Sequence, residues 1–134
     1  MIRSSAFVVA AAVMLLGCSN RESSVNRRPH NGTTTAAVVN GSQQLTIEVD
    51  DLFRFTPSTI VVHAGRVTIT LVHKGNGAPH DLQVVGFPTD NVPLTVHGQS
   101  TTSTFVAPSP GSYRFICTIH ERQGQTGTLV VLPD

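Results

Sequence analysis

Apolar and polar residues alternate with a period of two over much of the chain beyond residue 43. The segment Leu45–Val49 and the run Val67, Ile69 and Leu71 show this alternation plainly. A period of two places apolar side chains on one face of a β-strand. No segment carries an apolar stripe of helical period and helical length. The pattern therefore predicts a domain built from strands.

Turn residues divide this region into short runs. Ala64-Gly65, Gly86 and Pro108–Gly111 are the clearest breaks. We expect about seven to eight strands, an all-β arrangement typical of a Greek-key β-sandwich or barrel. Segment 87–98 holds two prolines and no clean alternation, so the pattern predicts no regular element there. The runs predicted as strands are 45–49, 59–63, 67–72, 80–85, 101–106, 112–117 and 126–132.

The N-terminus carries a different kind of apolar segment. Ala6–Leu16 is too short to span a bilayer as a mature helix. The sequence Leu15-Leu16-Gly17-Cys18 that ends it resembles the lipobox of bacterial lipoproteins. That resemblance implies a signal peptide over residues 1–17 and a lipid on Cys18. The alternative is an ordinary secretory signal cut nearby, which would remove Cys18, and both alternatives predict export.

The composition changes after Cys18. Residues 18–42 are rich in Ser, Asn, Thr and Arg and show no periodic apolar pattern, which predicts a flexible tether. Residues 43–134 then form the predicted domain, with five basic and seven acidic side chains and a net charge of −2. The whole chain has a formal net charge of +1 and no basic run, so we expect no nucleic-acid partner.

The cysteine count makes Cys117 informative. The chain has two cysteines, and Cys18 is predicted to be lipidated or removed. A lone thiol in an exported domain is unusual, because oxidising compartments favour disulfides. One explanation is a buried, inert cysteine that acts as a small apolar residue. The other is a metal thiolate, which His120, three positions later, favours.

Four residues have the chemistry of a mononuclear copper site. Cys117 offers a soft thiolate, His80 and His120 offer imidazoles, and Gln125 offers a weak fourth ligand. His120 and Gln125 lie between the last two predicted strands, and His80 begins an earlier one. We expect a sandwich to bring these side chains together at one pole.

Most of residues 43–134 resembles the cupredoxins, the small blue-copper proteins of the plastocyanin and azurin type. By this resemblance His80, Cys117 and His120 are the equatorial ligands of one type 1 copper. Gln125 falls where the family usually has an axial Met, and an axial Gln occurs in the stellacyanin branch. Asp81 stands where Asn is common, which leaves open whether it ties the two ligand loops together. The segments that carry the resemblance are 53–57, 60–65, 71–82, 105, 110–120 and 124–131.

The resemblance implies an electron carrier rather than an enzyme. His120 is then the expected electron port, ringed by Ala78, Pro79, Gly124 and Ile119. The expected partner is a redox protein such as a c-type cytochrome or a membrane oxidoreductase, met by a monomeric chain. Two alternatives remain open: a periplasmic copper-binding or delivery protein without electron transfer, and a metal-free cupredoxin-like interaction module.

The predicted location follows from the N-terminal segment. A lipid on Cys18 would anchor the chain in the cell envelope, with the domain facing the periplasm or the extracellular side. Ser19, directly after Cys18, favours the outer membrane by analogy with lipoprotein sorting.

Overall fold

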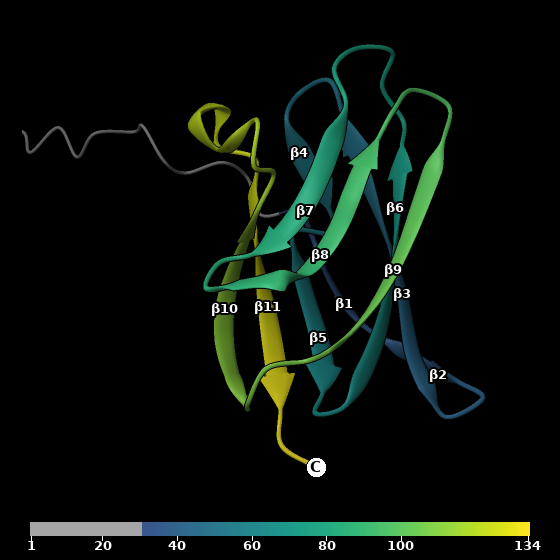
Figure 1. Cartoon of the computed structure of the whole chain (residues 1–134), viewed down its shortest axis with the longest axis vertical. Coiled ribbons are helices and arrows are strands. Elements are labelled where there is room, and N and C mark those ends of the chain that lie inside the picture. Colours follow the sequence, from purple (N-terminus) through teal and green to yellow (C-terminus); the bar gives the residue numbers. More distant parts are fainter. Residues whose placement is uncertain (1–30) are drawn as a thin grey trace, which may run out of the picture.

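A computed structural model describes residues 31–134, and these form two β-sheets packed face to face (Figure 1). The predicted all-β sandwich is therefore confirmed. The predicted signal peptide, residues 1–17, and Cys18 lie outside the described residues. Within residues 31–134 no helix has the length and apolar character needed to cross a membrane.

Each sheet mixes parallel and antiparallel pairs. The parallel pairs are β1 with β5, β5 with β11 and β3 with β6. The six-stranded sheet has the order β1 (Thr33–Thr35), β5 (Thr59–His63), β11 (Thr126–Leu132), β10 (Gly111–Ile116), β7 (His80–Val84) and β8 (Phe87–Thr95). The other sheet has the order β2 (Ala37–Val39), β3 (Ser42–Asp50), β6 (Arg66–His73) and β9 (Ser100–Val106), with β4 (Arg54–Thr56) paired to β3.

The core lies between the sheets and follows the predicted alternation. In β3 and β6 every second side chain is buried, which gives each strand one apolar face. Phe55 of β4 meets Phe115 of β10 edge to face across the sandwich, with ring centroids 5.0 Å apart. Gly127 leaves room for this pair, because a Cβ there would lie 2.1 Å from Cζ of Phe115.

The structure corrects two sequence predictions. The tether was expected to reach residue 42, but β1 and β2 already belong to the sheets, so that prediction is wrong for residues 33–42. Residues 31–134 also contain eleven strands rather than seven to eight, since β1, β2, β4 and β8 were not predicted. Strand β8 tolerates its two prolines because it is the edge of its sheet and needs no partner on one side.

One pole of the sandwich gathers three connections. These are the short link between β3 and β4, the loop of residues 74–79 before β7, and the loop of residues 117–125 between β10 and β11. Hydrogen bonds from the Asn76 and Gly77 amides to the Asp51 side chain join the first link to the second loop. Of the predicted metal ligands, His80 begins β7 directly after the second connection, and Cys117, His120 and Gln125 lie on the third.

Candidate metal centre

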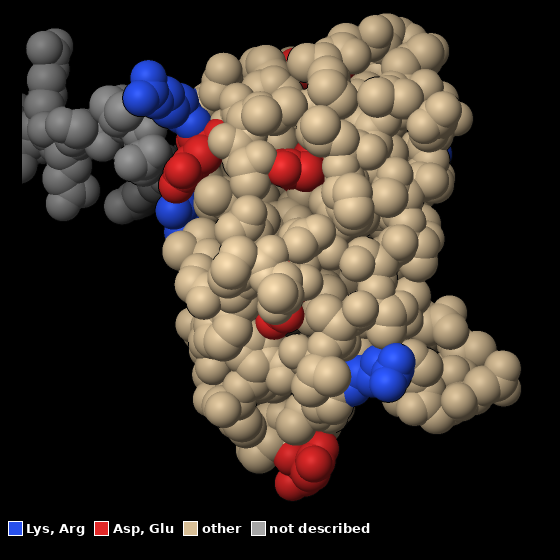
Figure 2. Space-filling model, in the orientation of Figure 1, with Lys and Arg blue, Asp and Glu red and all other residues tan. Residues whose placement is uncertain are grey.

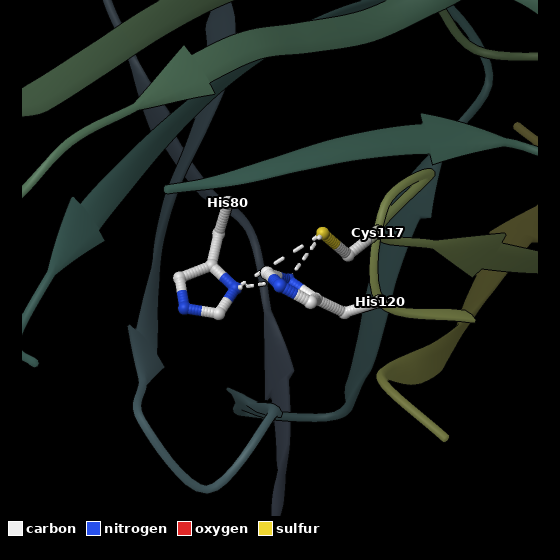
Figure 3. Close-up of side chains that lie close together, drawn as sticks. All are labelled: His80, Cys117 and His120. Atoms are coloured by element: carbon white, nitrogen blue, oxygen red, sulfur yellow. Dashed lines mark hydrogen bonds between the residues drawn. The ribbon is translucent and has the colours of Figure 1, made fainter. Parts of the chain in front are cut away.

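His80, Cys117 and His120 point toward one another at this pole (Figure 3). Nδ1 of His80 lies 3.2 Å from Nδ1 of His120. Sγ of Cys117 lies 3.4 Å from Nδ1 of His120 and 4.0 Å from Nδ1 of His80. The three potential ligand atoms lie within 4.8 Å of one another, close enough to share one metal ion. The structure thus brings together the three residues predicted as equatorial ligands.

The loop after β10 is folded so that it presents two of these ligands inward. The amide of Cys117 donates to the carbonyl of Gln125 at 3.1 Å, and the amide of His120 donates to the carbonyl of Cys117 at 3.2 Å. A 3-10 turn, η2 (Glu121–Gln123), then ends at Gly124, which has a left-handed φ of 81°. The compact loop keeps both ligands on the inner side of the pole.

Gln125 completes the group as a fourth neighbour. Its side chain is fully buried, and its Oε1 lies 2.7 Å from Nδ1 of His80. That nitrogen is also the one that faces Cys117 and His120. The amide oxygen therefore lies beside the place where the other donor atoms meet.

Burial sets the protonation of the donors. It raises the pKa of the Cys117 thiol to about 11, so the metal-free thiol carries its proton at neutral pH. Burial also lowers the pKa of His80, which keeps this imidazole neutral and able to bind a metal. A metal that binds here must displace the thiol proton.

Asp81 ties the two ligand loops together, which the sequence left open. One carboxylate oxygen accepts the Thr118 amide N–H at 2.6 Å, and the other accepts the Thr118 hydroxyl. Asp81 follows His80, and Thr118 follows Cys117. The pair therefore links the segments that carry the first two ligands.

Three further residues of the centre were not predicted from the sequence. Phe53 packs its ring on His120 at a centroid distance of 4.7 Å, from a backbone with a left-handed φ of 56°. His73 is buried beside His80, and Asp51 binds the loop that precedes His80. A left-handed φ is uncommon for an aromatic residue, and residues with such strained backbones cluster at functional sites, but nothing in the local sequence predicts this conformation.

The donors differ in their access to solvent. His120 is 8% exposed, whereas His80, Cys117 and Gln125 are completely buried. Around His120 lie the exposed residues of the ligand loops, including Ile119 at 49%. His120 is thus the donor nearest the surface.

The other described histidines do not join the centre as donors. Both ring nitrogens of His73 face loop carbonyls, and Nδ1 of His97 lies 2.6 Å from the carbonyl of Gly75. His63 is exposed at the C-terminal end of β5, near the carbonyl of Pro133. Each directs its ring nitrogens at backbone oxygen, although the ring of His73 also packs on His80.

The donor set fits copper. Two imidazoles, one thiolate and a weak axial oxygen are typical of a mononuclear electron-transfer copper site. Nε2 of Gln125 is buried and has no hydrogen-bond partner among residues 31–134. The polar contact of this side chain is therefore made by Oε1, which faces Nδ1 of His80. His80, Cys117 and His120 would hold the ion, and Gln125 would offer a fourth, weaker oxygen donor.

Comparison with solved structures supports the fold. Auracyanin A from Chloroflexus aurantiacus, a "blue" copper protein, is 23% identical over 69% of this chain and all of its own, with a TM-score of 0.61. The metal-binding domain of the Cu(I)-exporting ATPase CopA from Streptococcus pneumoniae is 18% identical over 76% of this chain and 97% of its own, with a TM-score of 0.63. Oxidised plastocyanin from Dryopteris crassirhizoma is 26% identical over 66% of this chain and all of its own, with a TM-score of 0.52.

Family comparison confirms the resemblance drawn from the sequence motifs. No curated protein sequence matches the chain. The family described as "Cupredoxin-like domain", however, matches residues 7–131, which is most of the chain. With the sandwich, the pole and its donor set as described, the chain belongs to the cupredoxin-like family.

Proposed function

We propose that the protein is a single-electron carrier with one type 1 copper per chain. The observation that carries this proposal is the convergence of His80 Nδ1, His120 Nδ1 and Cys117 Sγ, with Gln125 Oε1 against the same nitrogen of His80. A buried site with one thiolate and no second metal-binding group among residues 31–134 suits one-electron exchange.

The protein would contribute a fixed set of donors. Copper supplies the chemistry, the exchange of one electron between Cu(I) and Cu(II), which prefer different geometries. The Asp81–Thr118 link and the folded loop 117–125 hold the donors in one arrangement, so a change of oxidation state requires little movement. Complete burial of Cys117 keeps water away from the thiolate.

His120 would be the port through which the electron enters and leaves. It is the one donor with exposed surface, and the exposed apolar residues Ala78, Ile119 and Leu52 lie on the connections of the same pole. Figure 2 shows few charged side chains on the face that it draws. The proposed partner is a redox protein such as a c-type cytochrome or a membrane oxidoreductase. Redox encounters of this kind bury small surfaces and are weak and brief.

We further propose that the chain is exported and anchored in the cell envelope by a lipid on Cys18. The sequence Leu15-Leu16-Gly17-Cys18 supports this location. Mass spectrometry of the chain purified from membranes tests it, because lipidation would leave Cys18 as the modified first residue. An unmodified N-terminus beyond Cys18 would contradict the anchor and leave the copper proposal standing.

A copper titration tests the proposed centre. Adding Cu(II) to the metal-free protein should give an intense thiolate-to-copper band in the visible spectrum with a stoichiometry of one. Cys117→Ser should abolish the band. His63→Ala, which changes an exposed histidine at the C-terminal end of β5, should leave the band unchanged. A band that survives Cys117→Ser, or no band at all, would sink the proposal.

Copper delivery is the second candidate. The observation that favours it is the structural likeness to the metal-binding domain of a Cu(I)-exporting ATPase. A delivery protein should hand Cu(I) to an acceptor and exchange electrons slowly between its own copies. Fast electron self-exchange with no metal transfer to a Cu(I) chelator of moderate affinity would favour the electron carrier.

A further inference from the structure

His80 lacks the contact that usually orients a metal-binding histidine. Its ring is completely buried, and Nε2 has no hydrogen-bond partner among residues 31–134. A histidine that binds a metal through one nitrogen almost always donates the other N–H to an acceptor, which fixes the ring. Nδ1 of His80 does contact Oε1 of Gln125 at 2.7 Å, but Nδ1 is the nitrogen that would bind the metal. The ring therefore needs a second contact, independent of Nδ1, to keep its orientation when the site is loaded.

His73 lies where such a device is needed. Its ring packs on His80, with centroids 5.1 Å apart and planes tilted by 43°, and it is only 4% exposed. Nδ1 of His73 lies 3.1 Å from the carbonyl of Gly75, and Nε2 lies 2.8 Å from the carbonyl of Ala78. One imidazole therefore contacts both sides of the loop that leads into His80, and it contacts the His80 ring as well.

Asp51 holds the same loop from outside. Its two carboxylate oxygens accept the amide N–H groups of Asn76 and Gly77, at 2.8 and 2.9 Å. These two bonds lower the pKa of Asp51, so the carboxylate stays charged. Gly75 is required for this approach, because a Cβ there would lie 2.0 Å from Oδ1 of Asp51.

The loop of residues 74–79 thus lies between the imidazole of His73 on its inner side and the carboxylate of Asp51 on its outer side. A neutral imidazole has one N–H and donates to one of the two carbonyls that it faces, whereas the carboxylate accepts both amides. Pro79, whose ring fixes its own φ, is the last residue of this loop before His80. With the loop held in this way, the backbone of His80 has one position, and the ring of His73 limits the rotation of the His80 side chain.

We propose that His73 and Asp51 are positioning residues that hold His80 in its ligating orientation before the metal arrives. This inference rests on the proposed copper site, since it assigns the parts that prepare one of its ligands. We call the two residues the clamp, with His73 as its inner half and Asp51 as its outer half. The clamp takes the place of the hydrogen bond that Nε2 of His80 lacks.

Amide hydrogen exchange of the metal-free protein tests the outer half of the clamp. Asp51→Ala should speed exchange at the Asn76 and Gly77 amides by about tenfold or more, because each loses a bond to a charged acceptor. Asp51→Asn, which keeps one acceptor oxygen, should give an intermediate effect. Asp134→Asn removes an exposed carboxylate at the C-terminus and should change neither amide.

Copper binding tests the inner half. His73→Phe keeps a ring against His80 and loses both carbonyl contacts. We expect about a tenfold weaker Cu(II) affinity, the lower end of the loss found when a group that orients a metal ligand is removed. The nitrogen hyperfine couplings of bound Cu(II) should change as well, since they report the orientation of the imidazole. His63→Phe, on an exposed histidine, is the matched control and should leave both readouts unchanged.

The outcomes separate the clamp from the copper proposal. Unchanged exchange at Asn76 and Gly77 in Asp51→Ala overturns the clamp, even in a protein that binds copper normally. Faster exchange in the metal-free protein supports the clamp, even if no thiolate-to-copper band ever forms. If His73→Phe fails to fold, the Asp51 variants still decide between these results.

Discussion

Gln125 Oε1 lies 2.7 Å from His80 Nδ1, and that nitrogen also faces Cys117 and His120. The two residues are 45 positions apart in the sequence and meet only because β7 and β11 reach the same pole. The contact directs an amide oxygen, a hard donor, toward a site otherwise made of nitrogen and sulfur. Replacing Gln125 therefore tests directly whether this oxygen affects the reduction potential of the bound copper.

Gln125→Met should raise the reduction potential. A thioether is softer than an amide oxygen and favours Cu(I) over Cu(II). We expect an increase of at least about 59 mV, which corresponds to a tenfold change in the ratio of the two affinities. Voltammetry of the copper protein measures it. An unchanged or lower potential, with the visible spectrum intact, would remove Gln125 from the coordination shell.

Asp81→Ala should loosen the connection between the ligand loops. It removes the acceptor for the Thr118 amide and hydroxyl, and a bond to a charged group contributes about 1.5–3 kcal/mol. We expect the free energy of unfolding of the metal-free protein to fall by about 2 kcal/mol, measured with urea. Thr118→Val keeps the amide bond and loses only the hydroxyl, so it should cost less. Equal losses in the two variants would mean that the amide bond contributes nothing.

Phe53→Leu should free the His120 ring. The aromatic pair, with ring centroids 4.7 Å apart, contributes about 0.5–1.5 kcal/mol beyond its buried area. We expect a loss of stability in that range and faster solvent exchange of the His120 ring N–H proton in the diamagnetic Cu(I) form, observed by NMR. Phe87→Leu, which breaks the contact with Tyr113, is the matched control for losing an aromatic pair away from the pole. An effect on His120 in both variants would contradict a local role for Phe53.

The sequence predicted the alternating strands and the donor set, but for different reasons. Alternation in β3 and β6 is a local property of the sequence, so it can be recognised without knowledge of the fold. The donors were found because Cys117 and His120 stand close together and because the ordered motifs resemble the cupredoxins. No local spacing links His80 to the other two, so its place in the set depended on the expected sandwich, which brings its strand to the same pole, and on that resemblance.

The residues that support the donors could not be predicted from the sequence. Asp51 contacts the amide of Gly77 across 26 positions, and His73 was indistinguishable from an ordinary strand-end histidine. Strands β1 and β2 were missed because a run of Thr and a short Val pair in a Ser- and Asn-rich stretch show no alternation. Their conformation comes from pairing with β5 and β3, which is a tertiary effect.

Copper affinity should rise with pH. The metal-free Cys117 thiol has a pKa raised to about 11 by burial, and the metal binds the thiolate. Each copper ion bound below that pKa therefore releases the thiol proton, whereas His80, with its pKa lowered by burial, is already neutral. The apparent affinity should increase about tenfold per pH unit between about pH 7.5 and pH 9. Calorimetry in buffers of different ionisation enthalpy counts the protons, and a count of zero would mean that the thiol does not bind as thiolate.

Ala78→Glu should slow electron exchange with the partner and leave the copper centre alone. Ala78 is exposed on the loop that precedes His80, beside the apolar surface around the proposed port. A carboxylate there must lose water when the partner docks, which is costly without a matching cation. Stopped-flow oxidation of the reduced protein by a c-type cytochrome should show a rate lowered by about tenfold, equivalent to about 1.4 kcal/mol, with an unchanged visible spectrum and potential. Val106→Glu, on the exposed face of β9, introduces the same charge on another strand and should leave the rate unchanged. Equal rates in the wild-type protein and Ala78→Glu would place the docking surface elsewhere on the molecule.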